Sequence, residues 1–185
     1  HAATTDGYGG RVSTGLRDLF PMEEAFAVSD SLHRAVEHLQ EHPHISGPAA
    51  ARYRAAACEY RDRFHGLTLT TKQAAALMTN PALRVYDAPG QALACCFDPR
   101  KALCRKGTAT RAATTPDLTS CDDRCSNIAR TDKHISAIQS ELVMLQGEFD
   151  APTTPEPIRH RIRAQIERRR TIVSTHENAR EGEQP

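Results

Sequence analysis

Apolar residues recur at intervals of three and four along much of the chain, which is the spacing of one face of an α-helix. Residues that favour helix ends, such as Pro21 at a first helical position and Pro81 after a last one, bound these stretches. The pattern predicts helices over 21–42, 48–64 and 70–78. Residues 1–19 are rich in glycine, threonine and serine, so we expect a connecting segment there.

A different pattern follows the third helix. Apolar runs at 83–85 and 93–97 bracket an Ala-Pro-Gly turn, which is typical of a short β-hairpin. The polar stretch 105–120 is predicted to be a loop. Isoleucines and leucines at helical spacing then predict a long helix over 123–148 and a second long helix from Ile158 onward.

Three prolines between Ala151 and Pro157 must separate these two long helices. The last third of the chain is therefore predicted to be an antiparallel helical hairpin with an aliphatic seam. The fold class is mainly α: helical segments, a short β-hairpin with a cysteine knuckle, and the C-terminal helical hairpin. The expected divisions are a linker over 1–19, a helical region over 20–80, a cysteine knuckle over 81–126, the hairpin over 127–180 and a disordered tail over 181–185.

Composition narrows the class of protein. The 185 residues are 39% apolar and 5% aromatic, without tryptophan, so the core must be lean and aliphatic. The net charge of +1 gives no sign of nucleic-acid binding by the chain as a whole. We find no apolar run of membrane-spanning length and no signal sequence, so we expect a soluble, cytoplasmic protein with no membrane partner. The first residue is His1 rather than Met, so we expect a piece of a longer protein.

The cysteines are the most specific feature of the composition, because five of the six fall between residues 95 and 125. Four thiolates about 2.3 Å from one ion would form the closed tetrahedral site of a structural zinc. We expect zinc to join the hairpin to the following helix, with Cys121 and Cys125 one turn apart at the start of that helix. The predicted ligands are Cys95, Cys104, Cys121 and Cys125.

Other interpretations of these cysteines stay open. Cys96 could replace Cys95 as a ligand, and an iron–sulfur cluster, disulfides or plain packing could account for the cluster. Cys58 is interpreted as a core residue of the second helix. His38 and His42 also lie one helical turn apart, the spacing of a metal-binding pair, although the sequence offers no third ligand.

The second long helix is strongly basic between residues 158 and 170, with one acidic residue, Glu167. Such a helix could lie along a DNA phosphate backbone. The alternative is a solvated face on which arginines pair with Glu141 or Glu148 of the preceding helix. The candidate DNA-binding residues are Arg159, Arg161, Arg163, Arg168, Arg169 and Arg170.

The run TTDGYGG, from Thr4 to Gly10, resembles the end of the catalytic domain of tyrosine recombinases, the phage-type integrases, in which a Thr-Thr pair precedes the nucleophilic tyrosine. The stretches GPAAARY, NPALRVYD, QALACCFDPRKALC and CSNIARTDKHI resemble the cysteine-containing C-terminal region of integrase-like proteins of actinobacterial mobile elements. The likeness extends in order over nearly the whole chain.

This resemblance implies that Tyr8 is the catalytic nucleophile of a site-specific recombinase, the C-terminal portion of which is this chain. The phenolate attacks a DNA phosphodiester and retains the broken end as a phosphotyrosine, so no cofactor is needed for strand transfer. The family's arginines, lysine and histidine precede the tyrosine, so the chain alone should be inactive. The expected partners are DNA and other copies of the protein on DNA, and no small-molecule substrate is expected.

Two other classes of function remain open on the sequence. One is a non-enzymatic zinc-binding module that contacts DNA or protein, in which Tyr8 is an ordinary loop residue. The other is a structural coiled-coil interaction protein. Arginine and His-x-x-Arg motifs upstream of Tyr8 would indicate the recombinase.

Overall fold

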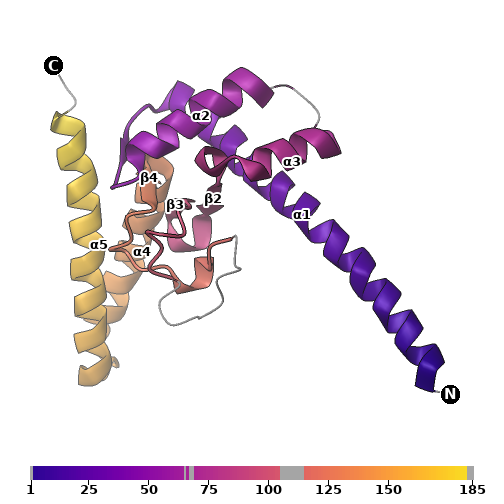
Figure 1. The fold of residues 1–185 in the computed structure, drawn as a ribbon. Coiled ribbons are helices and arrows are strands. Elements are labelled where there is room, and N and C mark those ends of the chain that lie inside the picture. Colours follow the sequence, from indigo (N-terminus) through magenta and orange to yellow (C-terminus); the bar gives the residue numbers. More distant parts are fainter. Residues whose placement is uncertain (1, 65, 67–68, 105–114, 183–185) are drawn as a thin grey trace.

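The structure is a computed structural model that describes residues 2–64, 66, 69–104 and 115–182, with the backbone alone described for residues 2–21 and 182. It is mainly helical with a small antiparallel sheet, so the predicted fold class is confirmed (Figure 1). The helices are α1 (Ala2–Glu41), α2 (Ala50–Phe64), α3 (Thr71–Thr79), α4 (Asp132–Asp150) and α5 (Glu156–Gly182).

The sheet that the described residues form has the strand order β1-β4-β3-β2, and every neighbouring pair is antiparallel. Its strands are β1 (Ile45–Ser46), β2 (Val85–Ala88), β3 (Leu93–Cys96) and β4 (Ile128–Thr131). The hairpin of β2 and β3 matches the prediction, with a 3₁₀ turn, η2, at Pro89–Gln91. The other two strands were not predicted.

Helix α1 packs against α2, α3 and β2, and one hydrophobic core joins these elements to the whole sheet. Val28 and Leu32 of α1, Leu77 of α3 and Ile128 of β4 are at most 2% exposed. Most core side chains are alanine, valine, leucine or isoleucine, as the lean composition predicts. The predicted helical region and the predicted cysteine knuckle therefore share one core.

Helices α4 and α5 lie side by side as the predicted antiparallel hairpin (Figure 1). Ile138 of α4 and Ile162 and Ile166 of α5 are buried, which confirms the aliphatic seam. The chain turns between them at the predicted prolines, since α5 begins one residue after Pro155. None of the described helices is long and apolar enough to cross a lipid bilayer.

The boundaries of two predicted helices are wrong. The helix predicted over 123–148 begins at Asp132, because Ile128 pairs with Cys95 across the sheet and the residues before α4 form β4. Thr131 then caps α4 in a capping box with His134. The predicted connecting segment over 1–19 is also wrong, because α1 begins at Ala2 and residues 2–19 are helical. A helix that is held by packing farther along can lengthen without a new nucleation cost.

Gly47 shows how closely β1 and β4 approach each other. Its φ of +96° lies in the left-handed region, and a Cβ atom built on it would lie 2.8 Å from the backbone oxygen of Ile128. A side chain at this position would therefore displace β4. Since β4 follows the cysteine-bearing loop directly, this contact also fixes where that loop ends.

Candidate functional site

Cys95 and Cys96 are both buried in β3, and the structure distinguishes between them. The Cys96 thiol lies against α2, 3.9 Å from the backbone oxygen of Ala49, and burial raises its pKa to about 12. Neighbouring residues of a strand point to opposite faces, so the Cys95 thiol lies on the other side. Cys95 is thus the better candidate ligand of the two.

The other three predicted ligands lie near Cys95. Burial is the main cause that raises the pKa of the Cys95 thiol well above its usual range, and the neighbouring thiols of Cys96, Cys121, Cys125 and Cys104 raise it further. Burial likewise raises the pKa of Cys121, with Cys104 and Cys125 next in importance. The four predicted ligands therefore form one electrostatic cluster, which we call the thiol cluster.

Arg52 of α2 holds the backbone on two sides of the thiol cluster. Its guanidinium donates hydrogen bonds to the backbone oxygens of Cys96, at 2.8 Å, and Ser126, at 2.6 Å, and to the side-chain oxygen of Asn127, at 3.2 Å. Asn127 is fully buried and donates in turn to the backbone oxygen of Asp98, at 2.9 Å. The end of β3 and the loop before β4 are thereby held together.

Asp123 ties the loop that carries Cys121 and Cys125 to the rest of the molecule. Its carboxylate accepts a 2.6 Å bond from Arg130 of β4 and lies 3.5 Å from Arg169 of α5. Because Arg130 is buried, the pair with Asp123 also keeps its charge from being isolated in the interior.

The local structure around Cys121 and Cys125 differs from the prediction. The two residues follow the 3₁₀ turn η3 (Leu118–Ser120) and lie in turns before β4, so they are not one turn apart on a helix. The backbone nitrogen of Cys125 bonds to the carbonyl of Asp122, which folds this segment into a turn. The reason is tertiary, because β4 pairs with β3 and the helix cannot start earlier.

The six cysteines, all of which are described, are free thiols, so the structure contains no disulfide between them. Cys58 is exposed on α2, contrary to the prediction of a core residue, because the neighbouring positions Ala57 and Tyr60 face the core instead. Among the described residues, no three His, Cys, Asp or Glu side chains are already arranged to hold a metal ion. His38 and His42, whose rings lie 5.8 Å apart, likewise have no third potential ligand arranged with them among the described residues.

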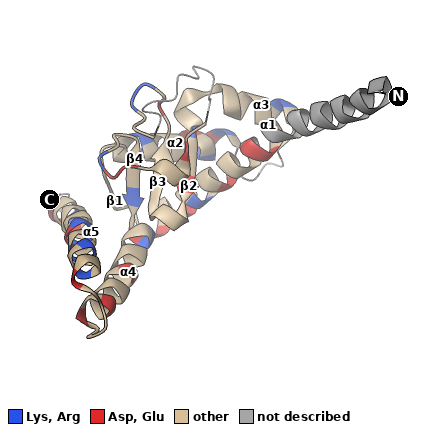
Figure 2. Ribbon diagram, turned by 90° about the horizontal axis from the view of Figure 1, so that it is seen from below, with Lys and Arg blue, Asp and Glu red and all other residues tan. Residues whose placement is uncertain are grey.

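Lys and Arg positions recur along the ribbon of α5, where Figure 2 draws them in blue. The arginine side chains differ in their partners. Arg169 bonds to Glu141 of α4 at 2.9 and 3.3 Å, as the solvated-face alternative expects. Arg159, which is half-buried, lies 3.7 Å from Glu156 and donates to the backbone oxygen of Ala151. The remaining four are exposed and form no ion pair with a carboxylate among the described residues: Arg161, Arg163, Arg168 and Arg170.

Tyr8 lies in the helical backbone of α1, and its side chain lies outside the described residues. The other three of the four tyrosines are core residues at most 8% exposed. Burial raises the pKa of Tyr53 and of Tyr86 well above the usual range, and the Tyr60 hydroxyl lies 2.7 Å from that of Ser29. None of these three phenols is suited to attack a DNA phosphate.

Sequence reasoning missed a buried polar network that joins α5 to α4 and β1. The His176 ring is 0% exposed, with Nδ1 2.7 Å from the Ser46 hydroxyl and Nε2 2.9 Å from the Asp132 carboxylate. Arg180 also bonds to Asp132. Because these partners are more than 40 residues apart in sequence, no local pattern could reveal them.

This network makes stability depend on pH. Burial lowers the pKa of His176, although the hydrogen bond with Asp132 opposes that effect, so the unfolded chain takes up a proton more readily than the folded one. The free energy of unfolding should therefore fall as the pH drops below about 6.5, by at most about 1.4 kcal/mol per pH unit for one such histidine. Urea unfolding at pH 7.5 and 5.5 measures the change.

The matched variants for this prediction lie on the same helix. His176→Gln should reduce the pH dependence, whereas His160→Gln, at an exposed position of α5, should leave it as in the unmodified chain. An equal pH dependence in the chain with and without His176 would contradict the role of this network.

No family model matches the chain, and neither a curated protein nor a solved structure matches it.

Proposed function

We propose that the chain is the C-terminal, DNA-contacting part of a site-specific DNA recombinase that acts through a phosphotyrosine intermediate. The observation that supports DNA contact most directly is the set of four exposed arginines on α5 that lack a carboxylate partner among the described residues. Unpaired surface cations are available to replace the counterions of a phosphate backbone. The recombinase assignment itself rests on the sequence resemblance around Tyr8.

Arg163 and Arg170 are the strongest candidates for phosphate contact. They are seven residues apart, so they lie on one face of α5, and Arg159 lies on the same face. The Arg163 guanidinium lies over the Phe149 ring of α4, 5.2 Å from its centroid, and that of Arg159 lies 6.0 Å from it. The aromatic ring restricts these side chains, so less conformational entropy is lost when they bind a phosphate. We call Arg159, Arg163 and Arg170 the α5 stripe.

The double variant Arg163→Ser/Arg170→Ser should lose two phosphate contacts. It should therefore bind duplex DNA about tenfold more weakly near 0.1 M salt, and the slope of log affinity against log salt concentration should fall in magnitude by about 2. Both residues are exposed, so the fold should be unaffected. Fluorescence anisotropy with labelled DNA over a range of salt concentrations measures both quantities.

A control of equal charge change separates specific contact from loss of net charge. Arg61 and Arg63 of α2 are about half exposed and already pair with Asp62 and Glu59. Arg61→Ser/Arg63→Ser should therefore change affinity and salt slope little. Equal weakening by both double variants would contradict a DNA-binding role for the α5 stripe.

A second candidate function is a zinc-binding interaction module without catalysis. The thiol cluster is compatible with zinc in either function, because its four sulfur donors come from three segments that a metal would join: β3, the loop after it and the loop before β4. In this proposal Cys95, Cys104, Cys121 and Cys125 hold a structural zinc. The two functions differ in the residues encoded upstream of His1, where the recombinase requires arginines and a His-x-x-Arg motif.

The proposed catalytic step requires little of this chain beyond one oxygen atom. The Tyr8 phenolate attacks phosphorus, the bond from phosphorus to the 5′ oxygen breaks, and the leaving oxygen takes a proton and becomes a 5′-hydroxyl. The reverse attack by a 5′-hydroxyl rejoins the strand. The cations that stabilise the transition state must come from residues outside this chain.

A further inference from the structure

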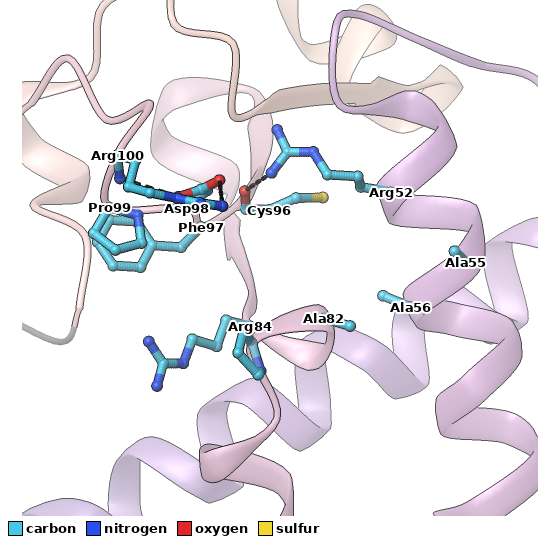
Figure 3. A pocket seen from close by; sticks show the side chains of 11 residues that line it. Arg52, Ala55, Ala56, Ala82, Arg84, Cys96, Phe97, Asp98, Pro99 and Arg100 are labelled. Carbon is cyan, nitrogen blue, oxygen red and sulfur yellow. Dashed lines mark hydrogen bonds and ion pairs between the residues drawn. The ribbon is translucent and has the colours of Figure 1, made fainter.

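A cavity of about 450 Å³ opens between α2, the 3₁₀ turn η1 (Pro81–Leu83) and the loop that follows β3. Figure 3 shows Arg52 and Arg84 on different sides of it, with Arg100 beyond Pro99. Three arginines from three separate segments line this one cavity. Its volume lies within the range of small-ligand sites.

The arginine charges are only partly balanced. Arg100 forms an ion pair with Asp98, at 3.0 Å, in its own loop. Arg52 bonds to carbonyl and amide oxygens, which leave its charge unneutralised. Arg84 donates to the backbone oxygen of Met78 at 3.3 Å, and no carboxylate among the described residues forms an ion pair with it.

Arg84 also carries a polar atom without a partner. Its Nε atom is buried and makes no hydrogen bond to any described residue. The Nε atoms of Arg130, Arg159 and Arg180 are also buried without a partner, but of these four arginines only Arg84 lines the cavity. An anion in the cavity would face the Arg84 guanidinium and supply the negative charge that it lacks.

The balance of charge selects the kind of anion. The charged residues that line the cavity are Arg52, Arg84, Arg100 and Asp98, so their net charge is 3 − 1 = +2. A phosphomonoester carries about −1.5 to −2 near pH 7, whereas a carboxylate or a phosphodiester carries one negative charge. Alanines at 55, 56 and 82 provide an apolar wall for the organic part.

We infer that this cavity binds a phosphomonoester, with Arg84 as the principal contact to the phosphate oxygens. The ligand is either a small molecule of nucleotide size or the phosphorylated 5′ end of a DNA strand, because both present the same dianion. The site is separate from the α5 stripe, so it goes beyond the proposed contact with duplex phosphates.

Isothermal titration of the full chain distinguishes the two sources. The probes are adenosine 5′-monophosphate against adenosine, and a short single strand with a 5′-phosphate against the same strand with a 5′-hydroxyl. In at least one pair we expect the phosphorylated probe to bind about 10- to 100-fold more tightly, the scale of a charge-assisted hydrogen bond. Preference within the first pair identifies a small ligand, and preference within the oligonucleotide pair alone identifies a strand end.

Two variants from different segments test the cavity itself. Arg84→Gln removes the cation, and Ala55→Asp places a carboxylate at an exposed position on the cavity wall, where it should not disturb the fold. Both should weaken the phosphorylated probe about tenfold or more. Ala51→Asp, one turn away on the exposed face of α2 and outside the cavity, is the matched control and should bind as the unmodified chain does.

The inference is overturned if neither phosphorylated probe binds more tightly than its unphosphorylated partner. It is also overturned if both cavity variants bind as tightly as Ala51→Asp, since the phosphate would then lie elsewhere. The Arg163→Ser/Arg170→Ser variant should leave binding of the nucleotide unchanged, so failure here is distinguishable from failure of the DNA-contact proposal.

Discussion

Removal of zinc by a chelator should lower the free energy of unfolding of the purified, reduced chain by about 4 kcal/mol, if free zinc exceeds its dissociation constant about a thousandfold before removal. For a chain of this size such a loss corresponds to roughly 8–16 °C in the unfolding midpoint. We expect one zinc per chain, measured by elemental analysis, and its release with a colorimetric chelator should accompany the loss of stability.

The size of this effect follows from where the thiols lie. Cys104 and Cys121 are only half-buried, and Cys121 packs against the edge of the hydrophobic core. The loops that bear them are held by polar contacts, namely the bonds from Arg52 to Ser126 and from Arg130 to Asp123. Metal binding would add to these core and polar contacts in ordering the region.

Cys121→Ser/Cys125→Ser should abolish zinc retention and lower the unfolding midpoint to that of the chelated chain. Cys58→Ser is the matched control, because Cys58 is an exposed thiol on α2 outside the cluster. Unmodified protein that contains no zinc, and that unfolds at one temperature with and without chelator, would contradict the zinc proposal. Absorbance of the purified protein at visible wavelengths would instead indicate an iron–sulfur cluster.

Local signals in the sequence are sufficient to predict several of the helices and strands. Helix α3 is close to the predicted 70–78 and ends before Pro81 as predicted, and the structure adds a capping box of Thr70 and Gln73 at its start. The turn at Pro89 forms the predicted hairpin. Each of these depends on residues within a few positions of one another, so propensity and capping decide the outcome without help from distant parts of the chain.

Elements that depend on distant partners were not predictable in the same way. Strand β4 has four residues and exists because it pairs with β3 on one side and β1 on the other. Its apolar residue Ile128 also fits the helical spacing of the residues that follow, so periodicity alone assigned it to a helix. The positions of Cys121 and Cys125 were misassigned for the same reason.

The candidate sites divide in a similar way. The clustering of cysteines and arginines is visible in sequence, and the preference for Cys95 over Cys96 follows from the alternation of a strand once β3 is recognised. The cavity beside Arg84 could not be found, because it is formed by α2, η1 and a loop that meet only in the folded chain.

In the intact recombinase that we propose, Tyr8→Phe should reduce covalent attachment to DNA below detection. The change removes the single oxygen that forms the phosphotyrosine bond. In other enzymes, removal of the catalytic nucleophile lowers the catalytic rate by on the order of 10⁴- to 10⁶-fold. DNA binding should be unchanged, because the proposed contacts are on α5. The control is Tyr53→Phe, which removes the hydroxyl of a buried tyrosine and retains its ring in the core.

The most direct test of the recombinase proposal is a search for a covalent protein–DNA adduct. The intact protein is incubated with labelled DNA cloned from the sequences that flank its gene, and an adduct that survives denaturation is sought. The account predicts an adduct that mass spectrometry maps to Tyr8, that persists in Tyr53→Phe and that disappears in Tyr8→Phe. An adduct on another residue, an adduct that Tyr8→Phe retains, or no adduct at all would contradict it.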